Sequence, residues 1–355
     1  MSKPKSVLCP ECGIPLGLAE ECLWLNSGVI VLAHDRLRRQ CFIESENLDP
    51  TFQLVSKMGV PDIEDLVLEA ARTRRASRTR ERIPPEVRAM IRNMLLNPDV
   101  LVEAMVSDTQ LRGFGDCEVL DLLLQGGEKD HATIRVNHTY SKPLFFGAFA
   151  GLIEGFLDRR LAFTLRDISP ETCEMSVFVT GLADTCSMSF EEKEYCHRDG
   201  DIELERCGSC GLPSALSRLQ WQLDRSIIKD SFGLRMVLFD PQVLDLIFKE
   251  LERRSGKTIS RAIIEAQCRF LLNSSKRELG PSRREISDEL ALRGLGNLRE
   301  FEMDRQGLRV SVENAACHLN TAGAFKALFE GLHGGDSRIE WDISENGDLE
   351  LDVRP

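Results

Sequence analysis

Apolar residues recur at helical spacing through two long segments of the chain, one in each half. The first segment covers 48–82 and the second covers 244–273, and both contain few helix-breaking residues. A spacing of three and four places apolar side chains on one helix face, so both segments are predicted to be helical. Pro84-Pro85 predicts the start of a further helix, because proline is tolerated in a first turn.

Farther along each half the apolar pattern changes to an alternation with period two, which is typical of strands. Strands are predicted at 119–124, 134–136, 161–166 and 173–180, and again at 301–304, 308–312, 338–342 and 348–353. A helix rich in glycine and alanine is predicted within each set, at 145–156 and 322–332. The predicted fold class is α+β, with helices packed on one face of a small antiparallel sheet in each half.

Matched motifs indicate that the two halves are copies of one unit. Leu-Arg-Gly-x-Gly occurs at 111–115 and 292–296, and Glu154-Gly155 matches Glu330-Gly331. Because the matched motifs keep the same order throughout, the chain is predicted to be a tandem repeat. The predicted domains are a first zinc-knuckle segment (1–47), a first unit (48–190), a linker with a second knuckle (191–243) and a second unit (244–355).

Two Cys-x-x-Cys motifs stand near the starts of these copies. Cys9-Pro-Glu-Cys12 and Cys207-Gly-Ser-Cys210 are each followed by glycine, an apolar residue and proline, which is typical of a zinc knuckle. Each knuckle supplies two thiolates, whereas structural zinc takes four ligands in a tetrahedron. We therefore predict one structural zinc ion bound by Cys9, Cys12, Cys207 and Cys210.

That prediction requires the fold to bring the two knuckles together, so other interpretations stay open. The motifs could be buried thiol pairs, a redox dithiol, or two separate half-sites. Residues near the knuckles that could complete separate sites are His34, Cys22, Cys41, Cys196 and His197.

Composition narrows the classes of function. Hydrophobic residues make up 42% of the 355-residue chain, which is ample for a packed core. The formal net charge of −12 argues against a general nucleic-acid binder, which needs a basic face. No apolar run approaches the roughly 20 residues of a membrane span. The first residues lack the apolar stretch of a signal peptide, which predicts a cytoplasmic protein.

A basic cluster interrupts this acidic chain. It comprises Arg72, Arg74, Arg75, Arg78, Arg80, Arg82 and Arg88. The cluster could contact an anionic ligand, an acidic partner or a nucleic acid, or it could form a solvated helix face. The second half has a thinner counterpart in Lys276, Arg277, Arg283 and Arg284.

The sequence contains no complete catalytic motif. A nucleophile elbow, a P-loop and a His-Glu-x-x-His motif are all missing, which favours binding over catalysis without deciding the matter. His138 and His318 precede the small-residue helices, where either could serve as an acid, a base or a polar anchor. A structural role is the alternative for both.

Four features together resemble a known family. They are Gly113-x-Gly115 after a helix, a strand ending in Arg135-Val136-Asn137, the small-residue helix and the final acidic hairpin. They resemble the 4-vinyl reductase domain, also called the predicted hydrocarbon-binding domain, which is related to haem nitric-oxide-binding and Golgi-transport tether folds. The resemblance covers residues 48–180 and 244–353, so the knuckles lie outside it.

The resemblance implies an apolar pocket between helices and sheet that binds a small molecule and serves regulation. The candidate wall of this pocket in the first unit comprises Phe145, Phe146, Phe149, Ile153, Phe156 and His138. These phenylalanines could equally be ordinary core residues.

The predicted function is that of a zinc-containing small-molecule-binding or regulatory protein with a pseudo-twofold tandem architecture. Its ligand would be apolar or amphipathic, and a protein partner is a further candidate. One alternative is an enzyme or cofactor-assembly factor whose thiolates handle a metal or a tetrapyrrole, as the family name suggests. Another is an interaction scaffold in which the zinc site holds two domains for a partner protein.

Overall fold

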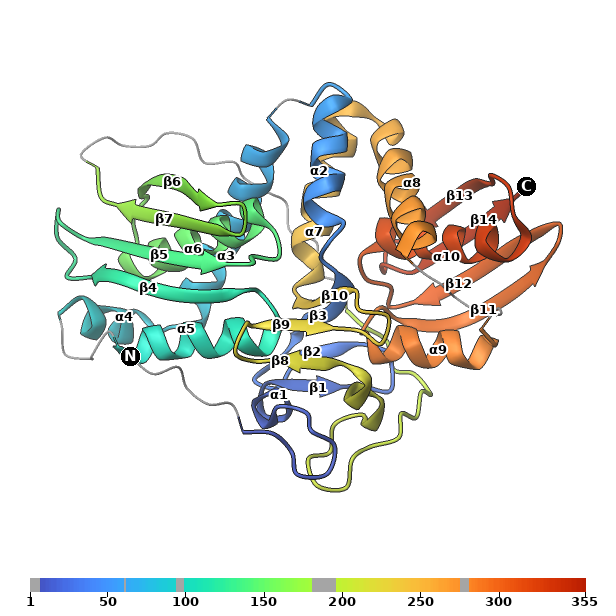
Figure 1. Ribbon diagram of the computed structural model, residues 1–355, viewed down its shortest axis with the longest axis horizontal. Coiled ribbons are helices and arrows are strands. Elements are labelled where there is room, and N and C mark those ends of the chain that lie inside the picture. The colour runs from blue at the N-terminus through green and yellow to red at the C-terminus, as the bar shows by residue number, and fades with distance from the viewer. Residues whose placement is uncertain (1–6, 61, 94–98, 181–195, 275–280) are drawn as a thin grey trace. The chain divides into compact units, whose positions relative to one another are not determined.

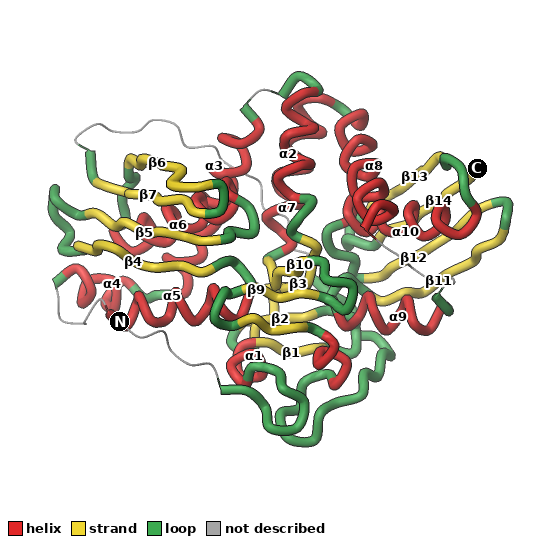
Figure 2. Tube along the Cα trace, in the orientation of Figure 1, coloured by secondary structure: helices red, strands yellow, loops and turns green. Residues whose placement is uncertain are grey.

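The computed structural model is an α+β protein, and it describes residues 7–60, 62–93, 99–180, 196–274 and 281–355. Within these ranges the strands form three antiparallel sheets (Figures 1 and 2). The chain divides into two compact units, which we describe one at a time. Unit 1 contains the described parts of 62–191 and 221–228, and unit 2 contains those of 7–61, 192–220 and 229–355. The domain boundary predicted between 190 and 191 falls outside the described residues, and the other predicted boundaries stay predictions.

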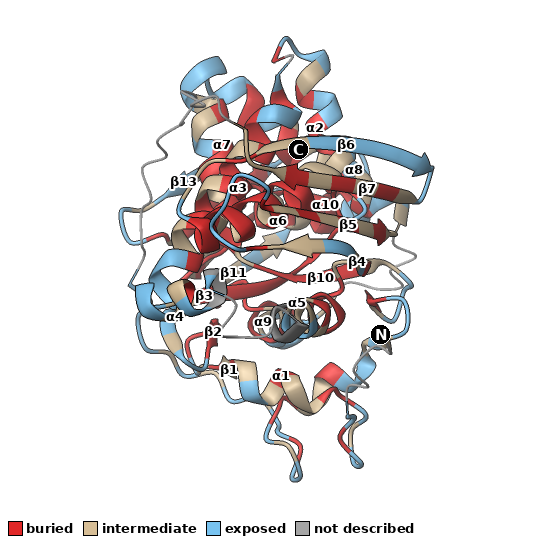
Figure 3. Ribbon diagram, turned by 90° about the vertical axis from the view of Figure 1, so that its left-hand side faces the viewer, coloured by how far each residue is buried: buried red, intermediate tan, exposed pale blue. Residues whose placement is uncertain are grey.

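Unit 1 is built on a four-stranded sheet with the order β4-β5-β7-β6. The strands are β4 (Asp116–Leu123), β5 (His131–Asn137), β6 (Ala162–Ser169) and β7 (Thr172–Phe178). Every second residue of β5 and β7 is buried, whereas the edge strand β6 is exposed over most of its length (Figure 3). This alternation places one face of the sheet in the core and the other in solvent.

Two helices of unit 1 approach each other closely because of glycine. The helices of this unit are α3 (Ile63–Arg82), α4 (Pro85–Arg92), α5 (Asp99–Arg112) and α6 (Lys142–Leu157). A Cβ atom on Gly147 would lie 2.2 Å from the carbonyl oxygen of Leu68, and one on Gly151 would lie 2.1 Å from that of Arg72. The backbone of α6 therefore rests directly on α3, at a separation that no larger residue permits.

Unit 2 contains a second four-stranded sheet, with the order β11-β12-β14-β13. The strands are β11 (Asn297–Asp304), β12 (Gly307–Glu313), β13 (Arg338–Ile343) and β14 (Leu349–Arg354). The helices that accompany it are α7 (Pro241–Ser255), α8 (Lys257–Ser274), α9 (Arg283–Leu292) and α10 (His318–His333). Both small sheets follow one topology, because in each the third and fourth strands along the chain appear in reverse order across the sheet.

The third sheet has six strands in the order β1-β2-β3-β10-β9-β8. The strands are β1 (Cys22–Trp24), β2 (Ile30–Leu32), β3 (Asp35–Glu44), β8 (Gln220–Gln222), β9 (Ile227–Lys229) and β10 (Arg235–Phe239). At its middle β3 pairs antiparallel with β10, from Cys41 opposite Phe239 to Glu44 opposite Met236. Of this sheet, β1, β2, β3 and β10 belong to unit 2, as do the helix α1 (Leu16–Glu21), the 3-10 helix Ser214–Arg218 and α2 (Leu48–Lys57).

The structure confirms most of the predicted elements and corrects two of them. The small-residue helices are α6 and α10, Pro85 begins α4, and the final hairpin turns between Ile343 and Leu349. The segments 48–82 and 244–273, however, are not continuous helices. Gly59 (φ +99°) follows α2, and Gly256 (φ +75°) separates α7 from α8. Left-handed glycines end helices, and the apolar spacing on either side does not reveal such breaks.

Candidate metal centre

The first knuckle is a tight turn that aims two thiols at one point. The N–H of Cys9 donates to the carbonyl of Ile14 (2.8 Å), and the N–H of Gly13 donates back to the carbonyl of Cys9 (2.9 Å). Gly13 has φ +73°, a conformation that glycine adopts without strain. The chain then enters α1 directly after Pro15, whose φ of −58° suits the residue before a helix.

The second knuckle repeats this geometry almost bond for bond. The N–H of Cys207 donates to the carbonyl of Leu212 (2.8 Å), and the N–H of Gly211 donates to that of Cys207 (2.9 Å). Gly211 has φ +72°, and a 3-10 turn follows Pro213. The same sequence signal, Cys-x-x-Cys-Gly-x-Pro, therefore produces the same local structure twice.

The fold brings the four cysteines of the two knuckles together within unit 2. The Sγ atoms of Cys9 and Cys207 lie 3.7 Å apart, and those of Cys12 and Cys210 lie 3.6 Å apart. All four sulfur atoms lie within 4.8 Å of one another, and this quartet could hold a metal ion. Among the described residues, no other group of three or more histidine, cysteine or acidic side chains has this arrangement.

The donor set favours zinc over harder cations. Four sulfur ligands suit a soft or borderline ion in tetrahedral geometry, whereas calcium and magnesium prefer oxygen. Cys9 and Cys207 are buried and the other two are partly exposed, so the site lies at the edge of the core. Four protein ligands fill a tetrahedron, which leaves no position for substrate or water.

The thiols of Cys9, Cys12 and Cys210 differ in acidity. A hydrogen bond from the backbone N–H of Cys12 lowers the pKa of Cys9 to about 7. Burial raises the pKa of Cys12 to about 12, and it also raises the pKa of Cys210. An ion that binds here has to displace the protons of the less acidic thiols, so its affinity should fall at low pH.

Glu11 connects the two knuckles and Arg206 connects the second knuckle to β1, and sequence analysis missed both residues. Glu11 accepts hydrogen bonds from the N–H of Ser209 (3.0 Å) and from that of Gly208 (3.2 Å). The hydroxyl of Ser209 lowers the pKa of the Glu11 carboxyl. Arg206 donates to the carbonyls of Trp24 (2.8 Å) and Gly211 (2.9 Å). Both residues lie inside or immediately beside a Cys-x-x-Cys motif, and this position is the sequence feature that could have identified them.

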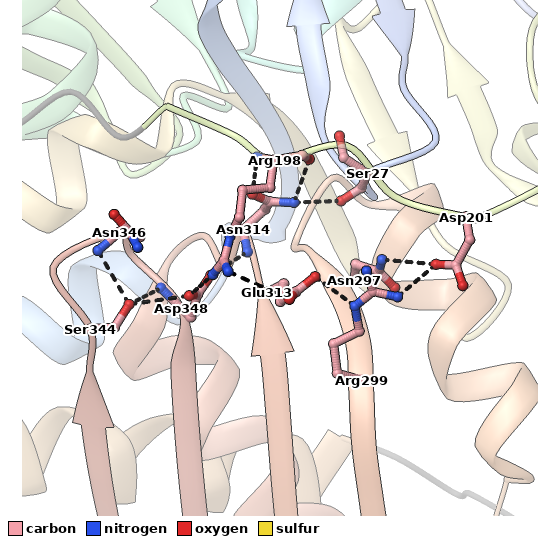
Figure 4. Close-up of polar contacts among 10 residues, drawn as sticks. All are labelled: Ser27, Arg198, Asp201, Asn297, Arg299, Glu313, Asn314, Ser344, Asn346 and Asp348. Atoms are coloured by element: carbon pink, nitrogen blue, oxygen red, sulfur yellow. Dashed lines mark hydrogen bonds and ion pairs between the residues drawn. The ribbon is translucent and has the colours of Figure 1, made fainter.

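A polar network holds the chain that leads to the second knuckle (Figure 4). The N–H of Arg198 donates to Oδ1 of Asn314 (2.8 Å), and Nδ2 of Asn314 donates to the carbonyl of Ser27 (3.3 Å). Asp201 accepts a hydrogen bond from Arg299 (2.8 Å). These contacts fix the segment before Cys207 against residues that precede and follow it by about 100 positions or more.

The candidate pocket residues all lie on α6 or just before it. Phe145, Phe146, Phe149, Ile153 and Phe156 are buried. Edge-to-face contact between Phe145 and Phe146 (ring centroids 5.5 Å apart) fixes the start of this layer. Burial agrees both with a pocket wall and with an ordinary core, so their binding role stays a prediction.

The two histidines do not occupy equivalent places. His138 is partly exposed in a left-handed conformation (φ +52°), with Nδ1 3.5 Å from a carboxylate oxygen of Glu171. His318 is buried as the first residue of α10, and its ring nitrogens contact Gly347 O (3.0 Å) and Asp245 Oδ1 (3.3 Å). The contacts of His318 are those of a structural residue, whereas His138 remains a candidate polar anchor.

The basic cluster is largely an internal feature of unit 1. Arg72, Arg74 and Arg88 are buried, so the interpretation as a solvated helix face is wrong for these three. Nε of Arg72 lies 3.0 Å from Oε1 of Glu154, and Arg88 donates to the carbonyl of Gly155 (3.2 Å).

In the second half, the counterparts Lys276 and Arg277 lie outside the described residues. Arg283 donates to the carbonyl of Arg299 (2.6 Å), and Arg284 lies 3.8 Å from Asp288.

Comparison of the chain with protein-family models, with curated proteins and with solved structures finds no match. Among the described residues, no helix has both the length and the apolar character that a membrane span requires.

Proposed function

We propose that this chain is a zinc-containing small-molecule-binding or regulatory protein of the 4-vinyl reductase type. One observation carries the proposal, namely the convergence of four thiols from two knuckles that are 198 positions apart in the sequence. A metal ion binds to such a site far more strongly in the folded chain than in the unfolded chain, so binding of the ion stabilises the fold.

The zinc would be structural. Cys9, Cys12, Cys207 and Cys210 would hold it, and the chemistry it supplies is a fixed crosslink between two distant segments. Because four protein ligands complete the tetrahedron, a binding or regulatory function is favoured over an enzyme that needs an open metal position.

The proposal includes descent of the two halves from one tandem unit. Three observations support it: the two small sheets have one topology, the two knuckles share the same hydrogen bonds, and β3 pairs antiparallel with β10. An antiparallel pair between matched strands is what a pseudo-twofold axis produces.

The ligand would be a small apolar or amphipathic molecule bound in the first unit. The aromatic layer on α6 supports an apolar wall, and the partly exposed imidazole of His138 supports a polar contact at its end. The matched helix α10 carries His333 and Lys326 among fewer aromatic residues, so we place the ligand in the first unit.

Native mass spectrometry of the chain purified without added metal tests the metal site. We expect one zinc ion per chain, and we expect Cys9→Ser and Cys207→Ser each to abolish binding. Cys196→Ser, which changes an exposed cysteine outside the quartet, is the matched control and should keep the ion. Two ions per chain, or one ion retained after either knuckle substitution, would contradict the shared site.

The same spectra test the ligand. A discrete organic mass that dissociates on denaturation, and that Phe149→Ala weakens, is the expected result. A chain with zinc but without any bound organic molecule, even after exposure to a panel of apolar and amphipathic compounds, would favour the interaction scaffold.

A further inference from the structure

A second pair of cysteines lies in contact inside unit 2, away from the knuckles. Cys41 belongs to β3 and Cys317 immediately precedes α10, and their Sγ atoms are 3.5 Å apart. Both residues are fully buried, and they are separated by 276 positions in the sequence. Contact between two reduced thiols at this distance requires only a small movement to reach a disulfide bond length of about 2.05 Å.

Hydrogen bonds of neighbouring residues fix the positions of the two cysteines. Arg39, two positions before Cys41, is buried, and its guanidinium donates to the carbonyl oxygens of Ala315 (2.9 Å) and Asn314 (2.5 Å). These bonds tie β3 to the segment that leads into α10. On the other side of Cys317, His318 contacts Asp245 and the carbonyl of Gly347. Both partners are therefore fixed by hydrogen bonds that do not involve sulfur.

The charge of Arg39 bears on reactivity. Its guanidinium interacts electrostatically with both Cys41 and Cys317, and the start of a helix also favours negative charge. The contact with Cys41 and burial act in the opposite direction and raise the pKa of Cys317. We therefore expect these thiols to react more slowly than the exposed thiol of Cys196.

Two other buried cysteines outside the knuckles, Cys268 and Cys173, have carboxylate neighbours. Cys268 is as deeply buried, but its Sγ lies 3.2 Å from a carboxylate oxygen of Glu330. Cys173 lies 3.1 Å from Asp167. Burial alone therefore does not distinguish Cys41 and Cys317 from these cysteines, whereas a thiol-to-thiol contact outside the proposed metal site does.

We propose that Cys41 and Cys317 form a redox-responsive pair, closed to a disulfide by a small peroxide. One thiolate attacks hydrogen peroxide, gains an oxygen atom to become a sulfenic acid and releases hydroxide. The neighbouring thiol then attacks this sulfur, which expels the hydroxyl group as water after proton transfer. In sum, two thiols and one hydrogen peroxide give one disulfide and two molecules of water. A peroxide is smaller than other thiol oxidants, so it is the oxidant best suited to a buried pair.

The disulfide would be a second crosslink in unit 2, distinct from the zinc site. It would join β3 to the start of α10 and close a loop that spans 276 of the 355 positions of the chain. Long loops give the largest reduction in the entropy of the unfolded chain, so oxidation should stabilise unit 2.

Peptide mapping of the zinc-loaded full-length protein tests the proposal. The protein is treated with hydrogen peroxide, alkylated under denaturing conditions, and digested without reductant. We expect a crosslinked peptide that contains Cys41 and Cys317, about 2 Da lighter than the sum of its reduced parts, and we expect dithiothreitol to remove it. Cys268 is the internal control and should be alkylated throughout. Zinc content measured in the same sample separates this reaction from oxidation of the knuckles.

Stability supplies the second readout. The melting temperature should rise by roughly 3 to 10 °C on oxidation and return on reduction. Cys41→Ser and Cys317→Ser should each abolish both the crosslink and the shift. Full alkylation of Cys41 and Cys317 after peroxide treatment, while Cys196 is oxidised and zinc stays bound, would overturn the proposal. That result needs no variant, so it holds even if the substitutions prevent folding.

Discussion

The helix pair α3–α6 of unit 1 and the pair α8–α10 of unit 2 each neutralise a buried glutamate, and they do so with different residues. Each pair contains a buried glutamate near the end of its second helix, Glu154 in α6 and Glu330 in α10. Glu154 accepts a hydrogen bond from the N–H of Leu161 (2.8 Å), and Glu330 accepts one from that of Ser337 (2.6 Å). Each glutamate thereby fixes the turn into the strand that follows.

The cation that neutralises the glutamate comes from different helices. In unit 1, Arg72 of α3 contacts both Glu154 and Glu69, and Arg160, which follows α6, contacts the same two carboxylates. In unit 2, Lys326 of α10 contacts both Glu330 and Glu265 (3.2 Å to the latter).

The sequence positions show a reciprocal exchange. Cys268 occupies the place in α8 that matches Arg72, and Ala150 occupies the place in α6 that matches Lys326. Cys268 accordingly lies beside Glu330. The comparison teaches that what matters here is a cation between two carboxylates, and that either helix can provide it.

The largest effect should come from removing the cation of unit 1. Arg72→Cys copies the residue of the second half and leaves the partly exposed Arg160 as the remaining cation beside Glu69 and Glu154, which should cost about 3 kcal/mol. Hydrogen exchange followed by mass spectrometry should report faster opening of α3 and α6, with α8 and α10 unchanged. Arg80→Cys, on an exposed part of α3, is the control and should have little effect.

A compensating substitution sharpens the same test. Ala150→Lys in the Arg72→Cys background should recover more than half of the lost stability, because it recreates the arrangement around Lys326. If the double variant opens as readily as the single one, the two networks are not equivalent and the comparison fails.

A smaller effect should follow from the last glycine of each helix. A Cβ atom on Gly155 would lie 2.4 Å from Cβ of Thr79, whereas one on Gly331 would meet nothing closer than Leu272 at 3.5 Å. Gly155→Ala should therefore destabilise α6 by about 1 to 3 kcal/mol. Gly331→Ala should be neutral or stabilise α10 by up to about 1 kcal/mol. Urea titrations combined with hydrogen exchange would measure both, and equal destabilisation by the two substitutions would be inconsistent with the difference in packing.

The smallest effect concerns the first residue of each helix, Lys142 or His318. Burial opposes the charged imidazole, but the Asp245 carboxylate and the carbonyl of Gly347 outweigh it and raise the pKa of His318. Arg39 also faces the ring and acts against its charge. Because the pKa of His318 is higher in the folded state than in the unfolded state, its charge stabilises the fold at pH values below the unfolded-state pKa. This stabilisation is lost as the pH rises through the folded-state pKa.

Unit 2 should therefore open slightly more easily at pH 8 than at pH 6, whereas Lys142 stays charged in unit 1 throughout. The Asp167 carboxylate raises the pKa of Lys142 further. Hydrogen exchange at the two pH values, corrected for the intrinsic rate, measures the difference. His318→Asn should remove the pH dependence of α10, and its persistence in that variant would assign it to another group.

The sequence predicted those parts of the molecule that local patterns determine. The small-residue helices, the final hairpin and the tight turn around each Cys-x-x-Cys motif depend on spacings of a few residues, and the structure contains all of them. The role of the two turns as zinc knuckles stays a prediction. The convergence of Cys9 with Cys207 could be predicted only conditionally, because spacing within each motif says nothing about how segments 198 positions apart meet.

Features that depend on long-range packing escaped prediction. The sequence favours a solvated face for Arg72, Arg74 and Arg88, because their burial arises from long-range packing that the local pattern does not indicate. The contact between Arg72 and Glu154 joins residues 82 positions apart, and no periodicity indicates it. For the same reason the contact between Cys41 and Cys317 was invisible, and Cys41 was considered only as a neighbour of the first knuckle.

The pairing of β3 with β10 has a consequence for how the chain is made. Ser45 and Arg235, which hydrogen-bond beside this pair, are 190 positions apart. At about 5 to 20 residues per second, a ribosome would need roughly 10 to 40 s to deliver β10 after β3 has emerged. During that interval the apolar residues Cys41, Phe42 and Ile43 would wait on an open strand edge, and the first knuckle would lack half of its ligands. An unpaired strand edge of this kind is prone to aggregation, so the nascent chain is most exposed to misassembly until its second half is synthesised.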